Sequence, residues 1–355
     1  MFALAIHSRP TGLHLPALGL WLDARRPCKD AEAVFISHAH SDHIAAHREV
    51  ILTEATRRLM SARVRGERRA HTLAFGETRR FQFGEVPFTL TLHPAGHVLG
   101  SAMALIEAAG ERLLYTGDFQ TRPHPMAGHC DPAGLPPVDV LVMETTFGRP
   151  EYQMPPVDRV LDDIIAFCRE ALGAGAVPLL QAYSLGKSQE LLAAVGGAGL
   201  PVALHCETAR LTRLHEELGC RFPPYEIFAE GTTKGRVLIF PPGARLPARV
   251  DGQPHFRTAA ATGWALDRAA KYRLGVDAAF PLSDHADFPA LVEFVRRVKP
   301  QRVFTTHGFA ADFAWTLRDL GFNARTLDGG EQLTLALPAS LPVTGKSAWR
   351  GNHDA

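Results

Sequence analysis

The sequence predicts an α/β protein whose first half is rich in strands and whose second half alternates strands with helices. Two observations support this fold class. Short β-branched or alternating apolar runs recur up to residue 143, and from residue 157 apolar residues return at the spacing of one helix face. The chain has 355 residues, which is enough for two domains or for one large elaborated domain.

In the first half, apolar runs closed by glycine, proline or aspartate predict strands. They lie at 33–37, 87–92, 102–107, 111–116 and 138–143. A second unit is expected to begin near residue 148. There, apolar side chains at the 3, 4, 7 spacing predict a helix from Val157 to Leu172, and the run at 176–181 predicts a buried strand after it.

The alternation of strand and helix then continues, as expected for a mainly parallel sheet. Helices are expected near 185–195 and 206–217, with a strand near 201–204 between them. A proline- and glycine-rich stretch at 241–254 predicts a loop or boundary. The elements predicted after it are strands at 255–260, 276–280 and 301–305 and a helix at 287–298.

Charge and cysteine content exclude several classes of protein. Lys and Arg number 38 against 37 Asp and Glu, so the formal net charge is +1 and the chain is no bulk polycation that attracts nucleic acid. The five cysteines form no CxxC pair, which argues against a disulfide framework and a thiolate zinc finger. The N-terminus has no signal-peptide pattern and no window could span a membrane, so we expect a cytoplasmic protein without a membrane partner. Its 17 histidines are candidate nitrogen ligands for a metal.

The strongest functional signal is the segment SHAHSDH at 37–43, directly after a predicted strand. His38 and His40 lie two residues apart at the strand end, so their side chains project the same way. Asp42 and His43 follow at what we expect to be the first turn of a helix. Neutral imidazoles together with a carboxylate suit zinc or manganese.

The HxHxDH pattern resembles the metallo-β-lactamase superfamily, and further motifs of that superfamily follow in order. HPAGHVLGS supplies His97, YTGDF supplies Asp118, and the early LGLWLD ends in Asp23. The resemblance implies an αββα sandwich and two divalent metal ions, with zinc first and manganese as the alternative. It implies one ion held by His38, His40 and His97, a second held by Asp42 and His43, Asp118 bridging the two, and Asp23 bracing the ligand loop.

Later motifs resemble the β-CASP nucleases within that superfamily. VMETTFG at 142–148 matches motif A and nominates Glu144, LSDHADF at 282–288 matches motif B and nominates His285, and FTTHG at 304–308 matches motif C and makes His307 a ligand of the second metal. The resemblance implies an inserted β-CASP α/β domain at 148–275 between two parts of a metallo-β-lactamase domain, 1–147 and 276–340, with a C-terminal tail at 341–355. AYSLGKSQE at 182–190 and TGWAL at 262–266 fall in this insert.

Within that branch, the motifs most resemble the bacterial ligase-associated DNA exonucleases. This resemblance implies a DNA exonuclease acting in repair, in functional association with an ATP-dependent DNA ligase and a helicase. His307 at motif C is more typical of RNA-directed branches, so an RNA-processing exo- or endoribonuclease is the alternative. In two-metal phosphodiester hydrolysis an activated water attacks phosphorus, and His285, oriented by Glu144, is expected to give a proton to the departing 3′ oxygen. Asp42 is predicted to be catalytic together with these two residues.

Substrate binding requires positive charge near the site. Lys187 falls in a glycine-containing turn before a predicted helix, so we expect Lys187, Ser184 and Gly186 to contact phosphate. For the arginines crowded into 57–80, a phosphate-tracking surface and an ordinary solvated face both remain open. Two other functions fit the sequence less well. A thioester or lactam hydrolase would not need Glu144, His285 or the insert, and a non-catalytic scaffold would be expected to have lost metal ligands.

Overall fold

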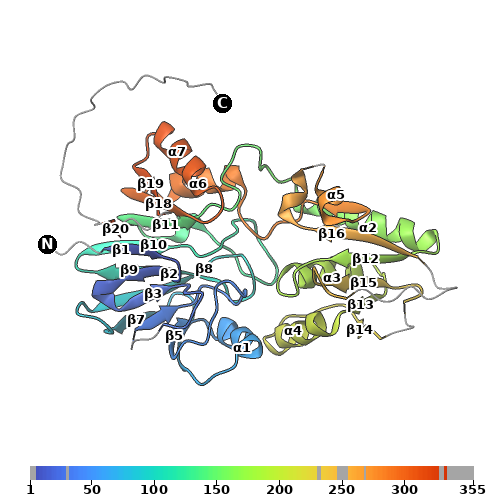
Figure 1. Cartoon of the computed structure of the whole chain (residues 1–355), viewed down its shortest axis with the longest axis horizontal. Helices are drawn as coiled ribbons and strands as arrows, with labels where there is room; N and C mark the ends of the chain where they lie inside the picture. The colour runs from blue at the N-terminus through green and yellow to red at the C-terminus, as the bar shows by residue number, and fades with distance from the viewer. Residues whose placement is uncertain are drawn as a thin grey trace, which may run out of the picture.

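The computed structural model describes residues 5–28, 32–229, 233–245, 255–267, 269–327 and 332–333. Within these residues the strands form three sheets, two in one lobe and the third in a lobe beside it (Figure 1). The predicted tail at 341–355 lies outside the described residues, as do residues 246–254 of the expected loop. No helix in the described ranges combines the length and apolar character needed to cross a membrane.

The first sheet is mixed, with the strand order β20-β1-β2-β3-β4-β5-β6. Strands β1 to β3 form an antiparallel meander, whereas β3 to β6 run parallel. The strands are β1 (Ile6–Arg9), β2 (Gly12–Leu15), β3 (Leu20–Leu22), β4 (Ala33–Phe35), β5 (Glu49–Leu52), β6 (Arg69–Thr72) and β20 (Gln332–Leu333). Because parallel neighbours need a crossover, helix α1 (Glu54–Arg63) connects β5 to β6.

The second sheet has the order β19-β18-β11-β10-β9-β8-β7. Strands β7 to β10 are antiparallel, and β10, β11, β18 and β19 are parallel. The strands are β7 (Thr78–Phe81), β8 (Phe88–Pro94), β9 (Ala102–Ala108), β10 (Glu111–Tyr115), β11 (Val140–Glu144), β18 (Arg302–Thr306) and β19 (Ala324–Thr326). Glu144 pairs with Thr306, so the chain that leaves this sheet after β11 returns directly beside it.

The two sheets pack face to face with helices on both outer sides. Phe35 of the first sheet and Phe88 and Tyr115 of the second lie in one buried cluster between them. Helices α6 (Phe288–Val298) and α7 (Ala310–Asp319) cover the second sheet, where Phe294 is fully buried, and α1 covers the first. These helix, sheet, sheet and helix layers (Figure 1) confirm the predicted αββα sandwich.

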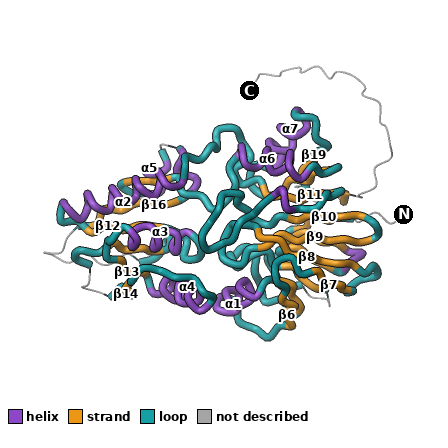
Figure 2. The backbone as a smooth tube through the Cα atoms, turned by 180° about the vertical axis from the view of Figure 1, so that it is seen from behind, coloured by secondary structure: helices purple, strands orange, loops and turns teal. Residues whose placement is uncertain are grey.

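The third sheet is parallel throughout, with the order β14-β13-β15-β12-β16-β17. Its strands are β12 (Val177–Gln181), β13 (Val202–Leu204), β14 (Tyr225–Ile227), β15 (Val237–Phe240), β16 (Phe256–Ala261) and β17 (Ala278–Phe280). Helices α2 (Val157–Gly173), α3 (Lys187–Gly197), α4 (Cys206–Glu217) and α5 (Ala270–Leu274) accompany it (Figure 2). The apolar face that predicted α2 is buried, since Val160, Ile164 and Cys168 share a cluster with Leu180 of β12.

Except for the helix expected to start at Asp42 and His43, each predicted strand and helix has a counterpart in the structure, with ends that shift by a few residues. The sequence did not indicate several further elements, which include the opening strands β1 to β3 and helices α1 and α7. Helix α1 illustrates why, because arginines and small polar residues dominate it and Leu59 and Met60 are its buried large side chains. A narrow apolar stripe gives a weak periodic signal.

The helix expected to start at Asp42 and His43 is wrong. The backbone N–H of His43 donates to the His40 carbonyl at 3.1 Å, which closes one turn, and the chain does not continue as a helix. Ile44 is instead buried in the core beneath α1, and His47 Nε2 donates to the Ala24 carbonyl at 2.8 Å. These tertiary contacts hold the segment after β4 in an irregular path, and α1 begins only at Glu54.

Candidate metal centre and active site

The candidate site lies where the parallel strands of the second sheet end. Strands β10, β11 and β18 point the same way, so their carboxyl ends bring Asp118, Glu144 and His307 to one edge. The other predicted residues reach this edge from loops after β4, between β8 and β9 and after β17; they are His38, His40, Asp42, His43, His97 and His285. Segments from most of the chain length therefore meet at one place.

Three imidazoles in this site each have one ring nitrogen bonded to an oxygen of the protein. The three contacts join His38 Nδ1 to Ser37 Oγ at 3.0 Å, His40 Nε2 to the Leu185 carbonyl at 3.1 Å and His97 Nδ1 to the Asp284 carbonyl at 2.8 Å. A carbonyl can only accept, so the rings of His40 and His97 are the donors. Ser37 Oγ donates to Asp23, so it accepts from His38. These bonds fix the tautomer of every ring.

The free nitrogens of the same rings face one another. His38 Nε2 and His97 Nε2 each lie 3.1 Å from His40 Nδ1. Each of these atoms presents a lone pair, and such an arrangement is stable when a cation lies between them. Zn–N bonds of about 2.0–2.1 Å in a tetrahedral site place ligand nitrogens roughly 3.3 Å apart. Burial and the neighbouring His97 lower the pKa of His40 to about 3, so its ring is a neutral ligand.

Asp118 approaches these imidazoles from the side of His43. Its Oδ2 lies 3.3 Å from His43 Nε2, 3.6 Å from His38 Nε2 and 3.9 Å from His97 Nε2. His38, His40, His97 and Asp118 each offer one ligand atom, all within 4.8 Å of one another. Although burial raises the pKa of Asp118, the imidazole of His43 holds it well below its usual range. The donor set therefore fits a divalent cation such as zinc.

Asp23, buried after β3, braces the ligand loop. Its carboxylate accepts bonds from Ser37 N at 2.7 Å, Ser37 Oγ at 2.6 Å, Tyr115 OH at 2.8 Å and His43 Nδ1 at 3.0 Å. Gly117 lets the loop before Asp118 approach this brace, because it has a φ of 53° and a Cβ there would lie 2.4 Å from Ser37 Cβ. One carboxylate thus fixes the loop after β4 and the ring of His43.

His43 lies beside Asp118, and both Asp42 and His307 lie near His43. Asp42 Oδ2 is 3.7 Å from His43 Nε2, and the Asp42 side chain is 68 % exposed. The His307 ring centroid lies 6.0 Å from that of His43, and His307 Nε2 accepts a bond from Arg25 Nη2 at 3.0 Å. The structure brings these predicted ligands to the site. Among the described residues, they are less tightly gathered than the cluster of His38, His40 and His97.

His285 and Glu144 form a pair beside the histidines. His285 Nδ1 donates to Glu144 Oε1 at 2.8 Å, and the carboxylate also accepts from the backbone N–H groups of Phe119 at 3.0 Å and Thr146 at 3.1 Å. Burial lowers the pKa of His285, but the carboxylate of Glu144 outweighs it and raises the pKa to about 9. The ring of His285 lies 4.6 Å from that of His97 between centroids. A proton donor thus adjoins the candidate metal ligands.

A cavity of about 870 Å³ opens onto these residues between the two lobes. Arg25 and Arg63 line it, together with Tyr183 and Ser184 from the loop after β12. Lys187 also reaches the wall, but its side chain is buried and its Nζ is paired with the carboxylate of Asp284. The structure therefore brings the predicted 184–187 turn to the site, with the charge of Lys187 already paired with that of Asp284.

Arg63 is the arginine of the 57–80 group that lines this cavity. It also donates from Nη1 to the Ala39 carbonyl at 2.5 Å. Other members of the group lie in ion pairs on the outer surface, namely Arg57 with Glu54, Arg58 with Glu217 and Arg79 with Glu77. These three of the eight arginines at 57–80 are therefore charge-paired on the surface, and Arg63 is the member placed to meet an anion.

Four residues of the site were not anticipated from the sequence: Arg25, Tyr183, Leu185 and Asp284. Asp284 precedes His285 in the LSDHAD motif, so the motif could have identified it as a site residue. Leu185 contacts His40 through its backbone carbonyl, and a contact of this kind cannot be predicted from a pattern of side chains. Tyr183, with 56 % of its surface exposed, lies 6.4 Å from the His40 ring between centroids. That proximity depends on how the two lobes meet.

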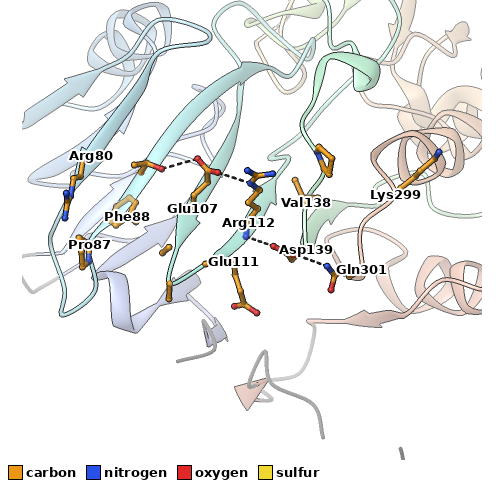
Figure 3. A pocket seen from close by; sticks show the side chains of 15 residues that line it. Arg80, Pro87, Phe88, Glu107, Glu111, Arg112, Val138, Asp139, Lys299 and Gln301 are labelled. Carbon is orange, nitrogen blue, oxygen red and sulfur yellow. Dashed lines mark hydrogen bonds and ion pairs between the residues drawn. The ribbon is translucent and has the colours of Figure 1, made fainter. Parts of the chain in front are cut away.

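A second cavity, of about 680 Å³, lies at the opposite end of the same strands (Figure 3). Its wall includes the start of β10 and the residues just before β11 and β18. The polar groups there satisfy each other, since Arg112 Nε donates to Glu107 at 2.9 Å and Asp139 accepts from Arg112 N at 2.8 Å and from Gln301 at 2.7 Å. Its lining residues include no histidine or cysteine, so it lacks the nitrogen and sulfur ligands that zinc prefers.

Comparison with a family model places a Beta-lactamase superfamily domain at residues 15–182. A crystal structure of a protein of unknown function from Enterococcus faecalis V583 has a similar fold, with a TM-score of 0.58 at 15 % sequence identity. The similarity covers 85 % of this chain and 80 % of that one.

Three curated proteins illustrate the similarity in sequence. The chain is 49 % identical over 333 residues to a "Probable DNA ligase" of Opitutus terrae, covering 93 % of this chain and 32 % of that protein. It is 33 % identical over 195 residues to "Endoribonuclease YSH1" of Mycosarcoma maydis, covering 45 % of this chain and 22 % of that protein. It is 29 % identical to "Transcription termination factor FttA" of Pyrococcus horikoshii, covering 51 % of this chain and 29 % of that protein. The chain spans a third or less of the length of each.

Proposed function

We propose that this protein is a metal-dependent nuclease that hydrolyses phosphodiester bonds, a proposal supported by the match of residues 15–182 to the Beta-lactamase superfamily domain. The observation that carries the proposal is that His40, Asp118 and His285 line one cavity. Hydrolysis needs an activated water and a proton for the leaving group. The cluster of candidate metal ligands would activate the water, and the pair of His285 and Glu144 would supply the proton.

Two divalent ions are part of the proposal, zinc first and manganese as the alternative. The proposed ligands of one ion are His38, His40, His97 and Asp118, and those of the other are Asp118, Asp42, His43 and His307. When bound, such ions lower the pKa of a water and neutralise the charge that develops on phosphate oxygens. The neutral imidazoles and the low pKa of Asp118 support ligation at the first of these sites.

The chain's own side chains then do the remaining work. His285 donates its Nε2 proton to the departing 3′ oxygen, while Glu144 holds Nδ1 and fixes the plane of the ring. Arg25 and Arg63 on the cavity wall attract the phosphate. Residues 148–275, as a β-CASP insert, close the cavity from the opposite lobe.

We propose DNA as the substrate and exonucleolytic trimming during repair as the role. The 49 % identity to a protein named as a probable DNA ligase supports a nuclease that works with a DNA ligase. We propose that this ligase is ATP-dependent and that a helicase acts with them on DNA ends. Relatives named as an endoribonuclease and an RNase J-like protein make RNA the substrate to compare against.

The proposal is tested with the purified, metal-loaded full chain and end-labelled single-stranded DNA and RNA of identical sequence. We expect stepwise shortening of the DNA that EDTA stops and that His38→Ala abolishes. Cleavage of RNA alone would overturn the DNA assignment, and a few discrete internal cuts would overturn the exonuclease mode. Hydrolysis of a thioester or lactam without cleavage of either strand would overturn the nuclease.

A further inference from the structure

The turn at 184–187, between β12 and α3, reaches the three-histidine cluster from the second lobe. The Leu185 carbonyl accepts the bond from His40 Nε2 at 3.1 Å. Lys187 is ion-paired with the Asp284 carboxylate, and the backbone carbonyl of Asp284 accepts the bond from His97 Nδ1 at 2.8 Å. Two of the three imidazoles are therefore held, directly or through one residue, by this turn.

These bonds decide which nitrogen each ring offers. Because His40 donates from Nε2 and His97 from Nδ1, His40 Nδ1 and His97 Nε2 remain as lone pairs, 3.1 Å apart. Oxygens that accept from the far nitrogen of a ligating imidazole fix its tautomer and raise its basicity. A shift of the turn would rotate the rings or free their protons.

The turn itself is fixed by a buried amide. Gln189 Oε1 accepts from Gly186 N at 2.8 Å, and Gln189 Nε2 donates to the Ser184 carbonyl and to Thr212 Oγ1, each at 3.0 Å. Gly186 has a φ of 92°, and a Cβ there would lie 2.6 Å from Val98 Cγ1. Gln189 is fully buried, so it acts on the site only through the turn.

The surroundings of Lys187 argue against a role in holding phosphate. Its side chain is buried, and its charge is matched by Asp284, whose Oδ2 is buried without a hydrogen-bond partner in the described part of the chain. A phosphate that drew Lys187 away would replace this close ion pair by the more distant contact between Asp284 Oδ1 and His285 Nε2, at 3.8 Å, which is unfavourable for a buried carboxylate. The ion pair is better suited to holding the loop of Asp284 against His97.

We propose that the 184–187 turn is an outer coordination shell of the three-histidine metal site, with Lys187 and Gln189 as positioning residues for His97 and His40. Residues outside the superfamily sandwich thereby complete its metal centre. This inference rests on the proposed metal site and makes the second lobe part of it.

The test measures the zinc affinity of the metal-free full chain by competition with a chromophoric chelator, for Lys187→Met, Gln189→Leu and the wild type. Loss of a group that orients a metal ligand costs about 10–100-fold in metal affinity, so we expect a weakening of this size in both variants. Lys234→Met removes an exposed lysine of the same lobe and should bind zinc within twofold of the wild type. The visible spectrum of the cobalt-loaded proteins should change in the two variants and not in the control.

The alternatives give different results. If Lys187 holds phosphate, Lys187→Met binds zinc like the wild type and raises KM for the oligonucleotide. If Lys187→Met does not fold, as judged by circular dichroism, Gln189→Leu decides the question. Wild-type zinc affinity in the folded variants would overturn the proposed role of the turn and leave the proposed metal site standing. A wild-type chain that binds no zinc would overturn this proposal and the metal centre together.

Discussion

His285 bonds a buried carboxylate through Nδ1 and leaves Nε2 for a substrate. Glu144, its partner, is almost fully buried and already accepts two backbone bonds, so its own position is rigid. A rigid carboxylate fixes the ring in one orientation, which is what a general acid needs to meet a leaving oxygen at hydrogen-bond distance. We therefore propose Glu144 as a positioning residue and His285 as the catalytic acid.

Replacement of His285 by alanine should separate catalysis from metal binding. We expect turnover to fall by at least about 100-fold, the usual contribution of a general acid. The zinc content by atomic absorption should stay unchanged, because His285 is not among the proposed ligands. As a matched control, His97→Ala should lose metal and activity together. Loss of metal from His285→Ala would show that this residue is a ligand and contradict its assignment.

Tyr183 offers a test of how the substrate lies. Its ring is largely exposed on the cavity wall beside His40, where a nucleobase next to the reacting phosphate could stack on it. Base stacking on an aromatic ring contributes about 1–3 kcal/mol per base. We expect Tyr183→Ala to raise KM for single-stranded DNA by the corresponding factor of about 5–150, with kcat little changed.

Tyr183→Phe keeps the stacking face and should retain the wild-type KM. Tyr272, which is 77 % exposed on the same lobe and does not line the cavity, provides the remote control Tyr272→Ala. Equal KM values for Tyr183→Ala and Tyr272→Ala would exclude stacking on Tyr183.

At the scale of elements, Asp287 joins helix α6 to the segment that leads into the third sheet. Its Oδ1 caps α6 by accepting from Ala290 N at 3.1 Å, and its Oδ2 accepts from Met154 N at 2.9 Å. Because Asp287, the N-cap of α6, lies two residues after His285, the same carboxylate anchors the loop that carries the proposed acid.

Asp287→Ala should therefore lower the free energy of unfolding by about 1–3 kcal/mol, from a lost helix cap and a second lost bond to a backbone N–H. Urea unfolding followed by circular dichroism measures the change. Asp312→Ala removes an exposed aspartate that pairs with Arg149 on the surface, and should cost less than about 1 kcal/mol. Equal losses in the two variants would contradict the capping role of Asp287.

At the scale of the whole molecule, the metal site joins loops of both sandwich sheets and the 184–187 turn of the other lobe. The lobes also share apolar packing, since Leu185 and Leu211 lie in one cluster with Ile44 and Leu59. A ligand that binds the folded state and not the unfolded chain stabilises it by mass action, by about 2.7 kcal/mol at 100 times its Kd.

Removal of metal should therefore lower the stability of the whole chain. We expect chelation by EDTA to lower the melting temperature and added zinc to restore it, as measured by differential scanning calorimetry. The variant His38→Ala/His97→Ala should start from the lower melting temperature and show no further fall with EDTA. An identical melting temperature of the wild type with and without chelator would contradict a resident metal.

The sequence by itself determined the fold class, half of the strands and four of the seven α-helices that the structure describes, and the histidine and aspartate motifs at strand ends. Periodicity reports burial along one element, so α2 and the apolar strands were readable, whereas α1, with few apolar side chains, was not. The spacing of the motifs likewise identified His38, His40 and His97 as candidate metal ligands before the structure was known.

Only the tertiary structure decided what holds these residues. The expected helix at Asp42 and His43 did not form, because Ile44 and His47 are drawn into contacts with distant segments. The roles of the Leu185 carbonyl and of the pair between Lys187 and Asp284 arise between residues up to 145 positions apart. Backbone acceptors and buried ion pairs depend on which loops come into contact in the folded chain. A local residue pattern does not predict such contacts.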